Sequence, residues 1–127
     1  MQGWRLLPLL ASALYGADVS GKWTGAVDVQ DPGGGEKISA RVRAEFVQKG
    51  ETVTGKIGRE QDAQLEPIRD GKLTGKTLTF EVIAEEATST AIRFTLMVVS
   101  EDRIEGGLTG AIEAGKISGK VVLSRSK

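Results

Sequence analysis

The chain has 127 residues, which is enough for one domain with its own hydrophobic core. It carries 17 basic and 17 acidic residues, so its net charge is zero and no basic excess indicates a nucleic-acid-binding surface. Cysteine and histidine are both absent. Their absence excludes disulfides, thiolate nucleophiles and imidazole ligands for a metal ion.

Residues 1–17 have the pattern of a secretory signal peptide. A single positive charge, Arg5, precedes the uncharged run 6–14, which is too short to span a bilayer as a helix. Small residues follow, and either Ala13 or Ala17 fits the position before the cleaved bond. The alternative is a short N-terminal helix packed on the domain. The signal-peptide pattern predicts an exported protein, periplasmic or secreted. Because no cysteine follows the run, a lipid-anchored lipoprotein is excluded, and we expect no stable membrane anchor once the leader is removed.

From residue 21 onward, apolar and polar residues alternate with a period of two, as they do in half-buried β-strands. The clearest example is 38–46, where every even position is apolar and the odd positions are polar. The same alternation predicts seven further strands, near 23–29, 53–57, 68–73, 78–82, 92–98, 104–108 and 117–123. No helical period is sustained after the leader, so the body of the chain is predicted to be all-β.

About eight strands joined by short polar turns predict antiparallel neighbours. An open meander would leave two exposed edges, and closure removes them. Eight strands make a barrel whose interior is filled by side chains or holds one small ligand. We therefore predict that 18–127 is a single domain, an up-and-down meander that closes as a small β-barrel. A two-sheet sandwich is the alternative.

A short motif recurs along the strands: an apolar residue, then Ser or Thr, then Gly, as at 23–25 and 53–55. The apolar residue and the glycine point to the same face of the strand. Glycine on the concave face lets a sheet bend sharply and leaves room for a large side chain opposite. A phosphate-binding loop would need a helix after the glycines, and the pattern predicts none.

Gly21 and Trp23 form a Gly-x-Trp at the first predicted strand, and Arg125 follows the last. This arrangement resembles calycins, the group that includes lipocalins and avidins, in which a basic residue packs across that tryptophan. The resemblance implies that these three residues close one end of the barrel, with stacking worth about 0.5–2 kcal/mol. The repeated hairpins also resemble small exported bacterial β-domains. Residues 18–127 contain only four aromatic residues, too few for the tryptophan-lined site of an avidin.

The predicted inward positions are aliphatic, aromatic or glycine, with no charged residue before Arg125. Catalysis needs a titratable group directed into a protected cavity, so we expect no catalytic residue and no enzyme activity. Acidic pairs such as Glu60 with Asp62 lie in predicted turns and lack the spacing of a calcium-binding loop. We therefore expect neither a metal site nor a cofactor.

These observations favour a non-enzymatic binding module, with two alternatives. In the first, a small apolar ligand lies inside the barrel, against Trp23, Val42, Phe46, Phe80, Phe94 and Leu96. In the second, the core is solid, and the outer face or the loops bind another protein, as in an inhibitor. Apolar residues predicted on the outer face agree with the second alternative: Val47, Ile83, Met97, Val99 and Val122. Whether the interior is empty or packed separates the two.

Overall fold

The computed structural model describes residues 18–30, 37–85, 90–112 and 115–126, and the predicted signal peptide lies outside these ranges. Within them the regular structure is entirely β and contains no helix. The strands are β1 (Gly21–Gln30), β2 (Lys37–Lys49), β3 (Thr52–Arg59), β4 (Glu66–Pro67), β5 (Arg69–Thr74), β6 (Thr77–Glu85), β7 (Thr90–Ser100), β8 (Arg103–Ile112) and β9 (Gly115–Arg125). The described part of the chain therefore also lacks any helix long and apolar enough to cross a membrane.

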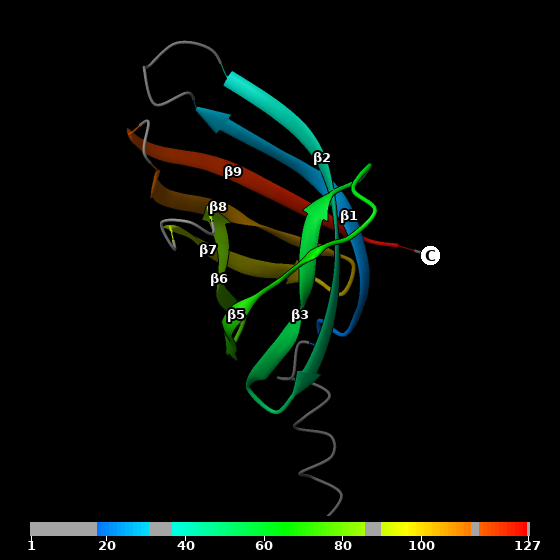
Figure 1. Ribbon diagram of the computed structural model, residues 1–127. Helices are drawn as coiled ribbons and strands as arrows, with labels where there is room; N and C mark the ends of the chain where they lie inside the picture. Colours follow the sequence, from blue (N-terminus) through cyan, green and yellow to red (C-terminus); the bar gives the residue numbers. More distant parts are fainter. Residues whose placement is uncertain (1–17, 31–36, 86–89, 113–114, 127) are drawn as a thin grey trace, which may run out of the picture.

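Eight of these strands form a closed antiparallel barrel (Figure 1). Neighbours along the chain pair with one another, and β9 returns to pair with β1 over eight residue pairs. The two-residue β4 is an additional strand that pairs with β3. The predicted up-and-down barrel is confirmed and the sandwich alternative is wrong, because the ring of hydrogen-bonded strands leaves no second sheet.

The strand pairing that closes the barrel is shortest between β3 and β5, where the register contains one residue pair, Thr52 with Lys72. The backbone nitrogen of Leu73 also donates to the carbonyl of Glu51, at 2.8 Å. A Cβ atom on Gly71 would lie 2.1 Å from a backbone oxygen of β3, so only glycine permits this approach. The irregular strand predicted at 68–73 corresponds to β5, which has a register shift between Arg69 and Lys72 and still closes the barrel.

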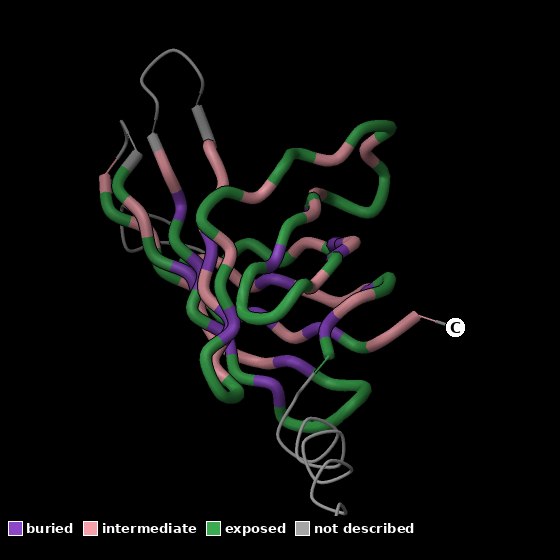
Figure 2. The backbone as a smooth tube through the Cα atoms, turned by 90° about the horizontal axis from the view of Figure 1, so that it is seen from below, coloured by how far each residue is buried: buried purple, intermediate pink, exposed green. Residues whose placement is uncertain are grey.

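The core lies inside the barrel, and nineteen of the hydrophobic residues that the structure describes are buried in it. Buried and exposed positions alternate along the strands, as the two-residue period requires (Figure 2). Glycines let the wall curve around this core. At Gly25, for example, a Cβ atom would lie 1.8 Å from the carbonyl oxygen of Val122 on β9. Among the described residues, no polar or charged residue is buried.

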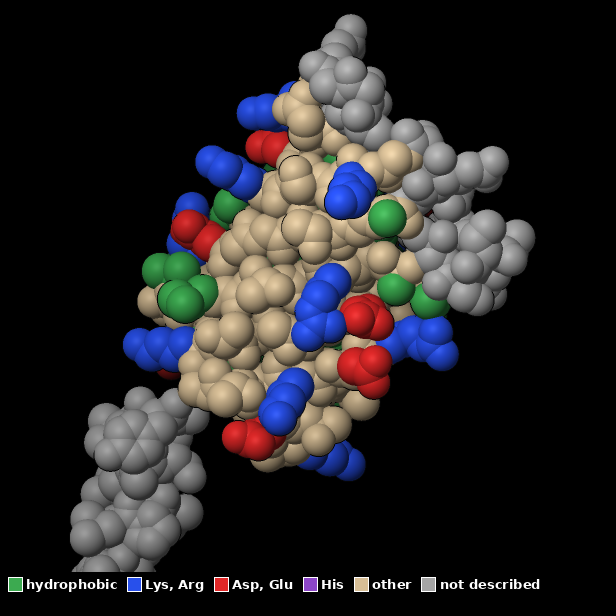
Figure 3. All heavy atoms as spheres, turned by 90° about the vertical axis from the view of Figure 1, so that its left-hand side faces the viewer, with side chains coloured by type: hydrophobic (Ala, Val, Ile, Leu, Met, Phe, Trp, Pro, Cys, Tyr) green, Lys and Arg blue, Asp and Glu red, His purple; other side chains and the backbone are tan. Residues whose placement is uncertain are grey.

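The outer surface carries charges of both signs, and Figure 3 shows them interspersed on one face of the molecule. The ion pairs here are exposed, as between Arg93 and Glu81, and such pairs contribute about 0–1 kcal/mol each. Among the apolar residues predicted to face outward, Val47, Met97 and Val99 are exposed, and the other two, Ile83 and Val122, are half-buried.

The up-and-down order divides the connections between two ends of the barrel. The turns after β2, β5 and β7 lie at one end with the start of β1 and the C-terminal residues, and we call this the closed end. Strands β1, β6 and β8 finish at the opposite end, and β2, β7 and β9 begin there. We call this the open end.

Candidate functional site

The closed end is built around Trp23 and Arg125, which are paired across β1 and β9. The guanidinium of Arg125 lies over the indole ring, 4.4 Å from its centroid. Trp23 is fully buried, and its Nε1 donates a hydrogen bond to the carbonyl of Val19 at 2.9 Å. Gly21 has φ +128°, and a Cβ atom there would lie 3.0 Å from Nη1 of Arg125. The three residues named by the calycin resemblance are therefore in contact.

The Arg125 guanidinium also connects two segments that are distant in sequence. Nη1 donates to the carbonyl of Ser20 at 2.7 Å, and Nη2 donates to the carbonyl of Asp18 at 2.8 Å. Nε donates to the carbonyl of Glu101 in the turn after β7, at 2.9 Å. A planar cation with a fixed set of donors suits this arrangement, which holds the segment before β1 across the base of the barrel.

The six residues predicted to line a cavity are all buried, and the structure places them within the hydrophobic core: Trp23, Val42, Phe46, Phe80, Phe94 and Leu96. The phenylalanine rings contact one another. Phe46 and Phe80 have centroids 5.7 Å apart, and Phe80 stacks on Phe94 at 4.7 Å with 15° between the ring planes. These contacting rings occupy part of the interior in which a deeply bound ligand would lie.

The open end presents a different set of inward residues, which lie near that end on β1, β2, β6, β7 and β9. We call them the mouth ring. They are the half-buried Val29, Val82 and Ile117, the buried Ile92 and the exposed Ile38. Ile38 shares the inner face because it pairs with Val29 across β1 and β2. Sequence reasoning did not propose these residues as a site, although a signal was present: each is an apolar inward position close to an open-end connection.

One charged residue also lies on the inner face at this end. Arg59 pairs with Val42 across β2 and β3, and cross-strand partners point to the same side of a sheet. The expectation of no inward charge before Arg125 is therefore wrong. Arg59 is the last residue of its strand, so its side chain, 63% exposed, reaches solvent beside Asp62, with 3.2 Å between Nη2 and Oδ1.

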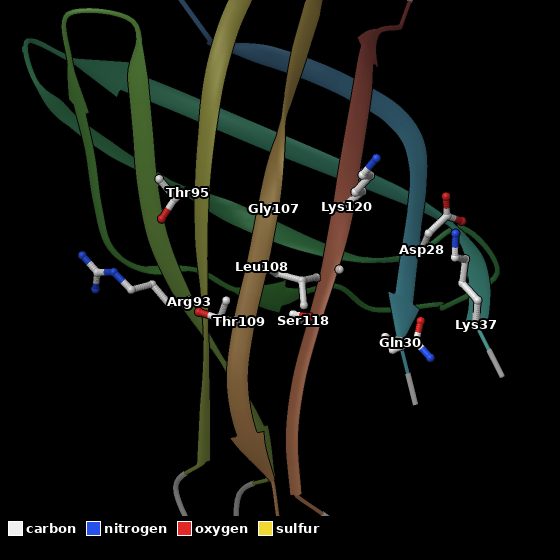
Figure 4. Close-up of a pocket in the computed structure, with 11 residues that line it drawn as sticks. Asp28, Gln30, Lys37, Arg93, Thr95, Gly107, Leu108, Thr109, Ser118 and Lys120 are labelled. Carbon is white, nitrogen blue, oxygen red and sulfur yellow. The ribbon is translucent and has the colours of Figure 1, made fainter. Parts of the chain in front are cut away.

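A polar groove of about 430 Å³ crosses the outer face of β7, β8, β9, β1 and β2 (Figure 4). Its lining combines cationic side chains, hydroxyl groups and glycine. The side chains labelled on its wall include Arg93, Thr95, Thr109, Ser118, Lys120, Asp28, Gln30 and Lys37. Sequence reasoning missed this groove, because the residues belong to five strands and become neighbours only when the barrel closes.

The described ranges contain no group of three His, Cys, Asp or Glu residues placed to hold a metal ion. The class of protein that the fold defines is a small, closed antiparallel β-barrel, in which an arginine stacks on a tryptophan at one end.

Comparison with known proteins agrees with this class. The chain is similar to the solved structure of a redesigned β-barrel, with 16% sequence identity and a TM-score of 0.58. The match covers 92% of this chain and 96% of that one. At this identity the similarity shows the fold alone. No protein-family model and no curated protein matches the sequence.

Proposed function

We propose that the protein is an exported, non-enzymatic, calycin-like barrel that binds a small apolar ligand at its open end. The observation that carries this proposal is the mouth ring: half-buried and exposed aliphatic side chains face inward at the end opposite the Trp23–Arg125 closure. Aliphatic side chains that stay partly exposed and lie together at one end of a barrel are candidates for contact with an apolar ligand.

The packing of the core limits where the ligand lies. The stacked rings of Phe80 and Phe94 belong to the buried core, so we place the ligand above them, at the mouth ring, rather than among them. If the ligand covers about 300 Å² of apolar surface, this burial contributes about 7 kcal/mol of favourable binding free energy. Association costs consume a large part of that, so we expect a dissociation constant in the micromolar range or weaker.

Three further observations support the remaining parts of the proposal. The contact among Gly21, Trp23 and Arg125 supports the calycin-like class. The described core contains no buried titratable group, which supports a role without catalysis. The signal-peptide pattern of residues 1–17 supports export and a single mature domain, 18–127.

The test uses N-phenyl-1-naphthylamine, a neutral apolar dye that fluoresces when it leaves water. We expect the wild-type chain to bind it and Val29→Lys to bind at least fivefold more weakly, because an ammonium group in the mouth ring disfavours an apolar ligand. Val47→Lys makes the same substitution on the outer face and should leave dye binding unchanged. Equal binding by all three proteins, or none by the wild type, would refute the proposal.

A second function, recognition of a protein through the outer face, is favoured by one observation. Met97 and Val99, both on β7, are each 53% exposed. Met97→Lys should then abolish complex formation with a partner that co-purifies with the exported protein, whereas Val29→Lys should preserve it. The reverse result would assign the interaction to the open end.

A further inference from the structure

We propose that the outer groove binds an acidic oligosaccharide, a hydroxyl-rich chain that carries carboxylate groups. The strand register arranges the groove side chains in two parallel rows that cross the sheet. One row consists of Arg93, Thr109, Ser118, Gln30 and Lys37, and the other of Thr95, Gly107, Lys120 and Asp28. The first row crosses five strands, so at about 4.8 Å per interstrand spacing it extends for about 19 Å. An elongated ligand fits such a surface.

The charges of the groove favour an anionic ligand. Among the described residues that line it, Arg93, Lys120 and Lys37 accompany a single carboxylate, that of Asp28. This local excess is not a consequence of composition, because the whole chain has zero net charge. The Asp28 carboxylate accepts a hydrogen bond from the hydroxyl of Ser39. The pairing of Arg93 with Glu81 is exposed and weak, so a ligand carboxylate can replace it.

The neutral side chains of the groove favour a ligand with many hydroxyl groups. Thr95, Thr109 and Ser118 are exposed and lie between the cations (Figure 4). Each hydroxyl both donates and accepts hydrogen bonds, which suits sugar hydroxyls that do the same. Gly107 adds no side chain between Thr95 and Lys120, so a ligand can approach the backbone at the centre of the groove.

Two other polymers fit the groove less well. An extended peptide usually binds by adding to a free strand edge, but β8 and β9 are each paired on both sides. Single-stranded nucleic acid requires aromatic side chains for base stacking, and none of the described residues that line the groove is aromatic. The combination of cations and hydroxyls without aromatic groups indicates an acidic sugar chain.

The experiment is isothermal titration calorimetry of the full chain with a galacturonic acid hexamer, with maltohexaose and a hexaglutamate peptide as comparison ligands. We expect binding of the hexuronate alone, weakened by added salt. Lys120→Gln should weaken it about threefold, as should Arg93→Gln, and the double variant should weaken it about tenfold. Thr109→Val removes a hydroxyl without changing the charge and should also weaken it about threefold.

Lys56→Gln is the matched control, since it removes an exposed lysine from the outer face of β3, outside the groove. An equal loss in this variant would show a general charge effect and overturn the proposal. Hexaglutamate binding as tightly as the hexuronate would overturn it in favour of an acidic peptide, and no hexuronate binding at millimolar concentration would overturn it outright. Val29→Lys should leave hexuronate binding intact, which separates this site from the mouth ring.

Discussion

Replacing Arg125 by alanine should cause a large loss of stability for a residue on the barrel rim. The substitution removes the cation over Trp23 and the three hydrogen bonds to backbone carbonyls that hold residues 18–20 and the turn after β7 together. A surface arginine in an ordinary ion pair makes no comparable set of contacts. We therefore expect a larger loss of stability, because this one side chain connects several segments of the closed end.

The magnitude follows from these contacts. The stacking contributes about 1 kcal/mol, within the range for partly exposed cation–π pairs. The Arg125 side chain is 28% exposed, so water compensates for part of each lost hydrogen bond, and about 0.7 kcal/mol for each of the three is appropriate. Together they lower the free energy of unfolding by about 3 kcal/mol. For a domain of this size, that corresponds to a fall in melting temperature of roughly 12 °C.

The assay is urea denaturation followed by far-UV circular dichroism. Arg103→Ala is the control, because Arg103 pairs with Glu105 on the outer face, and we expect it to cost less than about 1 kcal/mol. Arg125→Lys should be intermediate, since an ammonium group cannot reproduce the guanidinium's planar set of donors. A loss for Arg125→Ala no greater than that for Arg103→Ala would refute the reasoning.

Two further predictions concern the barrel wall and the leader. Gly25→Ala should cost more than about 3 kcal/mol in the same urea assay, because the new Cβ would lie 1.8 Å from the Val122 carbonyl oxygen. Gly75→Ala, in a turn with φ +64° and open space, should cost only about 1 kcal/mol, and similar losses for both would contradict the close approach of β1 and β9. Deleting residues 1–17 should retain the protein in the cytoplasm of a bacterial host with the circular dichroism spectrum of a folded barrel, measured after cell fractionation; continued secretion would contradict the export proposal.

The alternation of side chains determined most of the fold. A strict period of two identified the strands, their short turns made neighbours antiparallel, and eight strands with bend-permitting glycines predicted closure. Local alternation failed within β5, at Asp70 with φ +53°, where the register with β6 shifts between Arg69 and Lys72. It also missed Arg59, because a strand's last inward residue is not enclosed by the barrel.

The sequence by itself determined which side chains face inward, because a strand's two faces follow from residue parity alone. The tertiary structure decided what those side chains contact: it brought the phenylalanine rings together in the core and left half-buried aliphatic residues at the open end. The tertiary structure also forms the groove, because it brings Lys37 and Arg93, which are 56 residues apart in the sequence, into one lining. Neighbours across a sheet depend on strand order and register, which are properties of the closed barrel and not of any one segment.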